Sequence, residues 1–170
     1  MFKGIAKKKV MVNDVIVSIE YADLECLNHR KAIRTLLSEY MADPMGGKLP
    51  CHTLAKHKRM IDGLSCVPTA IIFLAFYKTK PVGMAICFSG FSTFNAAPLI
   101  NIHDIIVSKQ FRGNGIGRRL LMEIQELAIS TGCCKITLEV RKDNATARAL
   151  YRKTGFTKGT MPMEFLTKLM

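Results

Sequence analysis

The stretch of sequence that decides the fold runs from Ile100 to Arg119. It reads Ile-Asn-Ile-His-Asp-Ile-Ile-Val over residues 100–107, Ser-Lys-Gln-Phe over 108–111 and Arg-Gly-Asn-Gly-Ile-Gly-Arg-Arg over 112–119. A segment typical of a strand therefore leads into a three-glycine turn, and the turn leads directly into a segment typical of a helix. Such a turn points consecutive backbone N–H groups at one place, where the helix dipole also favours an anion. We expect glycine at Gly113, Gly115 and Gly117 because a Cβ would hold a pyrophosphate away from the amides.

Two common phosphate-binding turns do not fit this pattern. A Walker A loop needs Gly-Lys-Ser/Thr after its last glycine, whereas Ile116-Gly117-Arg118 follows Gly115. A dinucleotide fingerprint needs a third glycine at the position that Arg118 occupies. The pattern that remains is Arg/Gln-x-x-Gly-x-Gly, which residues 112–117 match.

Two further motifs follow in order: Leu-Glu-Val-Arg at residues 138–141, and Asn144-x6-Tyr151-x3-Gly-Phe. Together with the glycine turn, they make the chain closely resemble the GNAT superfamily of acyl-CoA N-acyltransferases over roughly residues 70–157. The resemblance implies an α/β fold with a mixed, mostly antiparallel sheet of six to seven strands flanked by four helices. The sheet would be splayed between its fourth and fifth strands, and acetyl-CoA would enter there.

The apolar periodicity agrees with one such domain over residues 1–170, with residues 1–9 as a basic tail. The predicted order is βααβββαβαβ. Its strands are expected within residues 10–21, 69–77, 82–91, 100–107, 135–141 and 163–168, its helices at 24–40 (capped by Asp23), 54–64, 115–131 and 145–154, and a loop at 91–99.

Composition excludes several other classes of protein. Hydrophobic residues make up 49% of the chain and charged residues 22%, as in ordinary globular domains. The longest apolar run, Ala70 to Tyr77, is far shorter than the roughly 18 residues that span a bilayer. No targeting segment is visible, so we expect a cytoplasmic protein without membrane contact. The six cysteines show no Cys-x-x-Cys spacing, which favours reduced thiols and predicts no metal site.

The net charge of +12 is spread along the chain. Nucleic-acid binding is disfavoured, because the chain has no Trp and its aromatic residues lie within apolar runs. Coenzyme A, with a pyrophosphate and a 3′-phosphate, is a sufficient anionic partner for this surface.

The resemblance also implies where acetyl-CoA binds. Its pantetheine arm would lie along the strand end formed by Ile105, Ile106 and Val107, where one backbone N–H would polarise the thioester carbonyl. The alternative is a plain buried strand. Arg118 or Arg119 would add a phosphate contact. The pyrophosphate would bind to the turn, which consists of Arg112, Gly113, Asn114, Gly115, Ile116, Gly117 and Arg118.

Tyr151 is the strongest candidate for a catalytic acid. A phenol with a pKa of about 10 stays protonated at neutral pH and can protonate a departing thiolate. Asn144 and Tyr151 are seven residues apart, so they share one helix face, with Ala147 between them leaving room for the cofactor. Asn144 would cap the helix and bond the pantetheine arm. The alternative for Tyr151 is packing on the sheet.

Glu139 is the leading candidate for the base, because a carboxylate inside an apolar strand is costly unless it is paired or points into a wet cleft. It precedes Tyr151 by twelve residues, as in ribosomal-protein N-terminal acetyltransferases, which the chain resembles. The alternative is an exposed carboxylate that pairs with Arg141 or Lys135. His103 and Asp104 are rivals: Asp104 for holding a substrate cation, and His103 for moving a proton. Polyamine acetyltransferases, which the chain also resembles, carry two acids here, so His103 argues against a polyamine substrate.

We therefore predict an acetyl-CoA-dependent N-acetyltransferase. It would act on a primary amine of a small molecule or peptide, by direct attack in a ternary complex and without a dedicated acyl-enzyme nucleophile. A homodimer is one option for its assembly. The alternatives are a non-catalytic acyl-CoA-binding domain and a basic RNA- or ribosome-associated module. Tyr151 favours the enzyme, since binding alone does not require its phenol.

Overall fold

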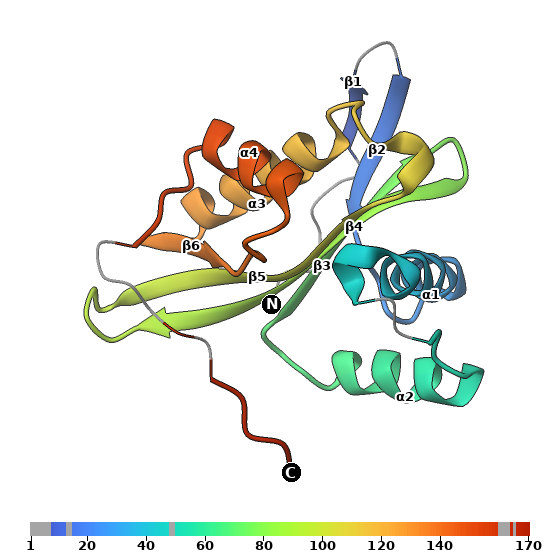
Figure 1. Cartoon of the computed structure of the whole chain (residues 1–170), viewed down its shortest axis with the longest axis horizontal. Helices are drawn as coiled ribbons and strands as arrows, with labels where there is room; N and C mark the ends of the chain where they lie inside the picture. Colours follow the sequence, from blue (N-terminus) through green and yellow to red (C-terminus); the bar gives the residue numbers. More distant parts are fainter. Residues whose placement is uncertain (1–7, 13–14, 48–49, 160–163, 165) are drawn as a thin grey trace.

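A computed structural model describes residues 8–12, 15–47, 50–159, 164 and 166–170. This part of the chain forms one mixed sheet with the strand order β1-β2-β3-β4-β5-β6. All neighbours in the sheet are antiparallel except β5 and β6, which are parallel. The predicted fold class is thereby confirmed (Figure 1). The elements are β1 (Lys8–Val12), β2 (Val15–Tyr21), α1 (Leu27–Ala42), α2 (Leu54–Ser65), β3 (Ala70–Tyr77), β4 (Lys80–Ser92), β5 (Ala97–Val107), α3 (Ile116–Ser130), β6 (Lys135–Leu138), α4 (Ala145–Lys153) and two short 3-10 helices, Pro44–Gly46 and Lys109–Phe111.

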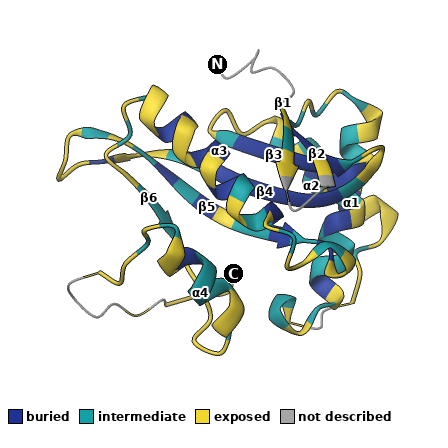
Figure 2. Cartoon of the chain, turned by 90° about the horizontal axis from the view of Figure 1, so that it is seen from above, coloured by how far each residue is buried: buried dark blue, intermediate teal, exposed yellow. Residues whose placement is uncertain are grey.

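The sheet separates two hydrophobic clusters, because successive side chains of a strand point to opposite faces. In β3, Phe73 and Ala75 face α3 and α4, whereas Ile72 and Leu74 face α1 and α2. Figure 1 shows the two helix pairs on opposite faces, and Figure 2 shows the buried residues concentrated in the middle strands. No helix of the described residues is both long enough and apolar enough to cross a membrane.

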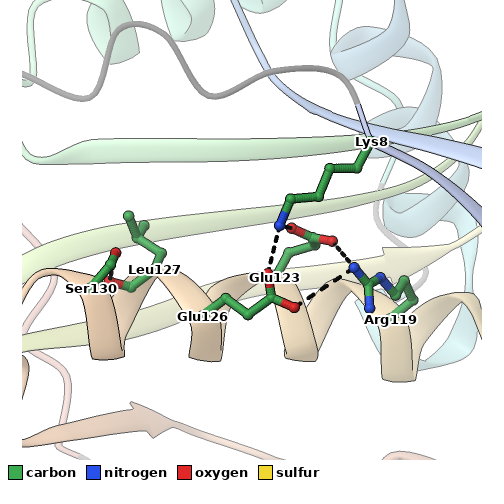
Figure 3. Close-up of polar contacts among 6 residues, drawn as sticks. All are labelled: Lys8, Arg119, Glu123, Glu126, Leu127 and Ser130. Atoms are coloured by element: carbon green, nitrogen blue, oxygen red, sulfur yellow. Dashed lines mark hydrogen bonds and ion pairs between the residues drawn. The ribbon is translucent and has the colours of Figure 1, made fainter.

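The segment predicted as a single first strand within residues 10–21 forms two antiparallel strands, β1 and β2, and the first of them begins earlier than predicted. Lys8 and Lys9, predicted as part of a basic tail, belong to β1, and residues 1–7 lie outside the described residues. Lys8 pairs through its Nζ with Glu123 at 3.1 Å and with Glu126 at 2.5 Å. Arg119 pairs with the same two carboxylates (Figure 3). These contacts tie the edge strand to α3 and place two cations beside the buried carboxylate of Glu123.

Helix α1 begins at Leu27, three residues later than predicted. The Asp23 carboxylate accepts the backbone N–H of Glu25, and the Asp23 N–H donates to His29 Nδ1. Asp23 therefore forms a turn before the helix, whereas the residue at the helix start is Cys26, which makes no side-chain cap.

The hairpin β4–β5 is longer than predicted, and the expected loop at residues 91–99 shrinks to residues 93–96. Its ladder contains an irregularity, because Ile86 pairs with Asp104 and Cys87 with Ile102. His103 is thus the extra residue of a β-bulge, a feature that redirects side chains and is frequent beside active sites.

Strand β6 pairs with β5 only from Leu99 to Ile102 and ends at Leu138, three residues earlier than predicted. β5 continues to Val107, so its end has left β6, as expected for the splayed sheet. The predicted last strand is not found: Glu164 and residues 166–168 are in no strand, whereas Met163 and Phe165 lie outside the described residues.

Candidate active site

The glycine turn lies between the short helix Lys109–Phe111 and α3. Gly113 and Gly115 have φ angles of 80° and 76°, in the left-handed region that favours glycine. Gly115 is the N-cap residue of α3 and provides no side-chain cap. The first intrahelical bond runs from the Arg119 N–H to the Gly115 carbonyl, so the N–H groups of residues 116–118 have no acceptor within the helix. The turn thus offers amides and a helix dipole to an anion.

Gly117 has a different physical role from the one the sequence suggested. A Cβ at this position would lie 3.1 Å from Leu150 Cδ2 and 3.6 Å from Val107 Cγ2. The missing side chain therefore lets the first turn of α3 approach α4 and the end of β5. Gly117 serves helix packing, whereas Gly113 and Gly115 set the backbone path of the turn.

Two polar side chains of the turn brace it from within. Arg112 donates from Nε to the Val107 carbonyl at 3.1 Å and from its guanidinium to the Asp43 carboxylate at 2.9 Å. The backbone N–H of Met45 and, after it, Arg112 hold the pKa of Asp43 below its ordinary value. Asn114 Nδ2 donates to the Phe111 carbonyl at 3.2 Å.

Of the two arginines expected near phosphate, Arg119 is held by Glu123 and Glu126, on the helix side shown in Figure 3. Arg118 is exposed at the start of α3. The structure therefore leaves Arg118 better placed than Arg119 to reach an anion bound at the turn.

The end of β5 presents alternate backbone groups to its open edge. The Ser108 N–H donates to the Val82 carbonyl of β4 at 2.9 Å. Because backbone groups alternate along a strand, the Ile106 N–H also points toward β4, whereas those of Ile105 and Val107 point away from it. The bond from Arg112 to the Val107 carbonyl agrees with that direction. The Ile106 side chain is buried among those facing α1 and α2.

Tyr151 lies on α4, with its ring centroid 5.8 Å from that of Phe156 and only 7% of its surface exposed. Burial, with a smaller contribution from Tyr40, raises the pKa of Tyr151 to about 12. Asn144 is the N-cap of α4, and its side-chain oxygen accepts the Ala147 N–H at 3.1 Å. The helix therefore has the capped start that the sequence predicted, and Tyr151 is a protonated, largely desolvated phenol at neutral pH.

The three candidate bases differ in their surroundings. Asp104 is partly buried, and burial raises its pKa, while His103 lowers it in part. The exposed ring of His103 lies edge-on to Phe88, with centroids 5.6 Å apart, and Phe88 packs on the side of α1 and α2. Glu139 follows β6 and is exposed. The bulge thus brings His103 and Asp104 to the sheet face that α1 covers.

Tyr40, near the end of α1, is a member of the site that sequence reasoning missed. Burial raises its pKa, and the charges of Asp104 and Asp43 raise it further, whereas Arg141 lowers it. Tyr40 also acts electrostatically on Tyr151. It therefore lies within electrostatic reach of both Asp104 of β5 and Tyr151 of α4. The only sequence signal was a tyrosine at the end of an amphipathic helix, which carries no chemical motif.

A model of the acetyltransferase (GNAT) family matches residues 33–156, most of the chain. The chain belongs to the GNAT acetyltransferase family. The family predicted from the glycine turn and the Asn–Tyr motif is thereby confirmed.

The curated relatives with similar sequences include named N-acetyltransferases. The chain is 28% identical over 142 residues to the N-alpha-acetyltransferase MAK3 of Arabidopsis thaliana, a match that covers 82% of this chain and 67% of that protein. It is 38% identical over 78 residues to the N-alpha-acetyltransferase RimI of Mycobacterium tuberculosis, covering 45% and 48%. Among the relatives with the strongest matches, the chain spans as little as 15% of their length.

Solved structures share the fold at low sequence identity. An aminoglycoside acetyltransferase from an uncultured soil sample superposes with a TM-score of 0.75 at 19% identity, covering 91% of this chain and 97% of that one. An aminoglycoside N-acetyltransferase in complex with CoA superposes with a TM-score of 0.72 at 15% identity, covering 90% and 95%. At these identities the likeness concerns the fold.

Proposed function

We propose that this protein is an acetyl-CoA-dependent N-acetyltransferase that acts on a primary amine of a small molecule or peptide. The observation that carries the proposal is the buried, protonated phenol of Tyr151, whose helix packs against the start of α3 directly behind the glycine turn. A domain that only binds acyl-CoA has no need for this phenol. We further propose that residues 1–170 form one domain and that the protein is cytoplasmic.

The residues present fit acetyl-CoA. The uncapped amides of Ile116, Gly117 and Arg118 would hold the pyrophosphate, and the left-handed Gly113 and Gly115 leave the approach clear. The backbone groups of Ile105 and Val107 that face the open edge of β5 would bind the pantetheine arm, and Ile106 would pack beneath them. When bound, the cofactor supplies an acetyl thioester.

The remaining residues near the turn would support these contacts. Arg112 and Asn114 would hold the backbone of the turn in place, as their bonds to Val107 and Phe111 do here. The side-chain oxygen of Asn144 is engaged in capping α4, which leaves its amide N–H₂ to reach the pantetheine arm. Ala147, on the Tyr151 side of the helix, would leave space for that arm.

Tyr151 would act as the acid that protonates the departing thiolate, because its pKa of about 12 keeps it protonated at neutral pH. One of the outward N–H groups, of Ile105 or Val107, would stabilise the oxyanion. Attack by the amine would then proceed directly in a ternary complex.

For the base we favour Asp104 over Glu139. The raised pKa of Asp104 brings it closer to the working pH, and its partial burial strengthens its interaction with an ammonium group. Glu139, the leading candidate from sequence, is exposed beyond the end of β6 and is retained as the alternative. His103 beside Asp104 and the phenol of Tyr40 would position the acceptor.

The test combines binding with turnover. Acetyl-CoA is titrated by calorimetry, and CoA release is followed with peptide N-termini, amino acids, aminoglycosides and polyamines. We place peptide N-termini first because two relatives are named N-alpha-acetyltransferases. Gly115→Asp serves as the control, since it adds a negative charge beside the pyrophosphate and should abolish both signals. Tight binding without turnover on any amine would indicate an acyl-CoA-binding domain, and RNA binding without CoA binding would refute the proposal.

A further inference from the structure

An open pocket of about 410 Å³ lies between the outer face of α1 and the start of α2. Its volume falls within the range of small-molecule sites. Arg34 and Ser38 are one helical turn apart, on the side of α1 opposite Leu36, which packs on the sheet together with Tyr40. The pocket is therefore separate from the candidate active site on the sheet side of α1. The residues that line it are Arg34, Thr35, Ser38, His52, Leu54 and His57.

His57 is the most buried residue of the pocket, with 3% of its surface exposed. Its Nδ1 lies 3.2 Å from the Thr53 carbonyl, and its Nε2 lies 3.3 Å from Ser38 Oγ. Because a carbonyl can only accept, Nδ1 carries the proton of the neutral ring, and Nε2 accepts the hydroxyl of Ser38. His57 thus ties the start of α2 to α1, so the walls of the pocket are held in place without a ligand.

His52, the second imidazole of the pocket, is not held in this way. Its ring lies edge-on to that of His57, with centroids 5.2 Å apart. Its Nδ1 is buried and has no hydrogen-bond partner among the described residues, a rare condition for a polar atom in a folded protein. Since Nδ1 is closed off from solvent, Nε2 is the nitrogen that can reach a ligand. His52 therefore has hydrogen-bonding capacity that the described part of the chain does not use.

The charged groups around the pocket are positive. Arg34 makes no ion pair with any other residue that the structure describes. Burial lowers the pKa of His52, and the nearby Lys56 and His57 lower it further. All of these neighbours disfavour a second positive charge, so the electrostatic potential in the pocket favours an anion.

The other titratable groups of this region do not offset that potential. Glu39 accepts the backbone N–H of Lys109, on another side of α1, and Asp62 pairs with two basic residues. The thiol of Cys51 donates to the Ser38 carbonyl at 3.6 Å. No carboxylate of the described residues lines the pocket, so a bound anion would meet no like charge there.

We propose that this pocket binds the phosphate group of a small phosphomonoester. The planar guanidinium of Arg34 would hold two phosphate oxygens. His52 would donate from Nε2, and its ring would take up a proton from solvent as the dianion binds. Leu54, whose side chain is 68% exposed at the start of α2, would contact the organic part of the ligand. Inorganic phosphate lacks that contact and should bind more weakly.

Calorimetry with glycerol 3-phosphate and with inorganic phosphate tests the assignment on the whole chain. Arg34→Gln should weaken glycerol 3-phosphate binding by roughly 10- to 100-fold. Arg59→Gln is the matched control, because it removes the same charge from an exposed position of α2 outside the pocket, and it should bind like the wild type. Leu54→Asp should abolish binding while the fold stays intact, since a carboxylate is favourable at the start of a helix. Melting temperatures verify the fold of each variant.

Inorganic sulfate tests the proton uptake at His52. Unlike a phosphomonoester, whose second pKa is about 6, sulfate stays divalent, so a change in its affinity between about pH 6 and about pH 8 reports the protein alone. Sulfate should bind more tightly at the lower pH. His52→Gln keeps a hydrogen-bond donor but cannot titrate, so it should lose this difference. A difference that persisted in His52→Gln would refute the role of His52.

Four outcomes would overturn the assignment of the pocket. The wild type could bind none of the three anions at millimolar concentration. Arg34→Gln and Arg59→Gln could weaken binding equally, which would indicate a diffuse effect of surface charge. Gly115→Asp could abolish glycerol 3-phosphate binding, which would place the phosphate at the glycine turn. A short RNA could bind far more tightly, with Arg34 and Arg59 contributing alike, which would assign the surface to nucleic acid. None of these readouts depends on acetyl transfer.

Discussion

The Asp43 carboxylate at the end of α1 accepts a hydrogen bond at 2.9 Å from the guanidinium of Arg112, at the start of the glycine turn. The same guanidinium holds the Val107 carbonyl through Nε. Helix α1, the end of β5 and the turn are therefore connected through one side chain. Since α1 also carries Tyr40, this connection links the proposed acceptor side of the site with the proposed cofactor side.

Asp43→Asn should weaken acetyl-CoA binding although Asp43 is expected to touch no part of the cofactor. The folded pKa of Asp43 is lowered, so its charge stabilises the fold above the ordinary carboxyl pKa of about 4. That contribution is lost as the pH falls through the lowered folded value. The stability difference from wild type, at most about 1 kcal/mol for a half-exposed pair, should thus be present at neutral pH and vanish in acid.

Calorimetry and denaturant unfolding at several pH values check this prediction. Asp62→Asn is the control, because Asp62 pairs with Arg30 and Lys58 between α1 and α2, away from the turn. Equal acetyl-CoA affinity in Asp43→Asn and wild type would show that Arg112 holds the turn without its partner.

The effect of Gly117→Ala on stability should change sign when Leu150 is replaced by alanine. An alanine in the helix gains up to about 1 kcal/mol over glycine, but its Cβ would lie 3.1 Å from Leu150 Cδ2. We expect Gly117→Ala to destabilise the wild type by roughly 1 kcal/mol and to stabilise the Leu150→Ala background, where only the propensity gain remains. A denaturant double-mutant cycle measures this, and the same sign in both backgrounds would refute the packing role of Gly117.

The sequence predicted correctly those features that depend on one continuous segment of the chain. The turn from Arg112 to Gly117 and the helix from Asn144 to Tyr151 are local patterns, because left-handed glycines, a cap and a helical spacing depend on neighbours in the chain. β6 was predicted too long, since Val140 continues the alternating apolar pattern of Ile136 and Leu138 after the pairing with β5 has ended. The hairpin β4–β5 was predicted too short, because its Gly, Ser, Asn and Pro residues are also typical of loops.

The features that were missed depend on packing between distant segments. The approach of Tyr40 to Asp104 and Tyr151 brings together α1, β5 and α4, and the pairing of Asp43 with Arg112 spans 69 residues. No local pattern encodes such contacts. The bulge at His103 likewise depends on the register between β4 and β5, which the hydrophobic pattern alone does not give to within one residue.

Tyr151→Phe should lower kcat by roughly 10²–10⁴-fold, the usual range for a positioned acid. The ring still packs near Phe156, so acetyl-CoA affinity and the melting temperature should change little. Because the pKa of Tyr151 is about 12, the wild-type rate should not fall from its ionisation in mildly alkaline solution. Tyr21→Phe is the control, since Tyr21 packs against the same core cluster from β2. If Tyr151→Phe kept nearly full turnover on a confirmed amine, the proton for the departing thiolate would have to come from a group other than Tyr151.

Asp104→Asn should separate the two candidate bases, because it affects rate and stability in opposite directions. The folded pKa of Asp104 is raised by burial, so its charge destabilises the fold once the pH rises above the ordinary carboxyl value. We expect Asp104→Asn to raise the melting temperature at neutral pH while lowering kcat/KM by roughly 10²–10⁴-fold, most between the pKa of Asp104 and that of the amine, where the carboxylate is ionised and the amine is still protonated. Glu139→Gln, at an exposed position, should leave stability unchanged and cost little activity. Thermal melts and pH–rate profiles of both variants decide which of the two carboxylates is the base. A large loss of rate in Glu139→Gln alone would assign that role to Glu139.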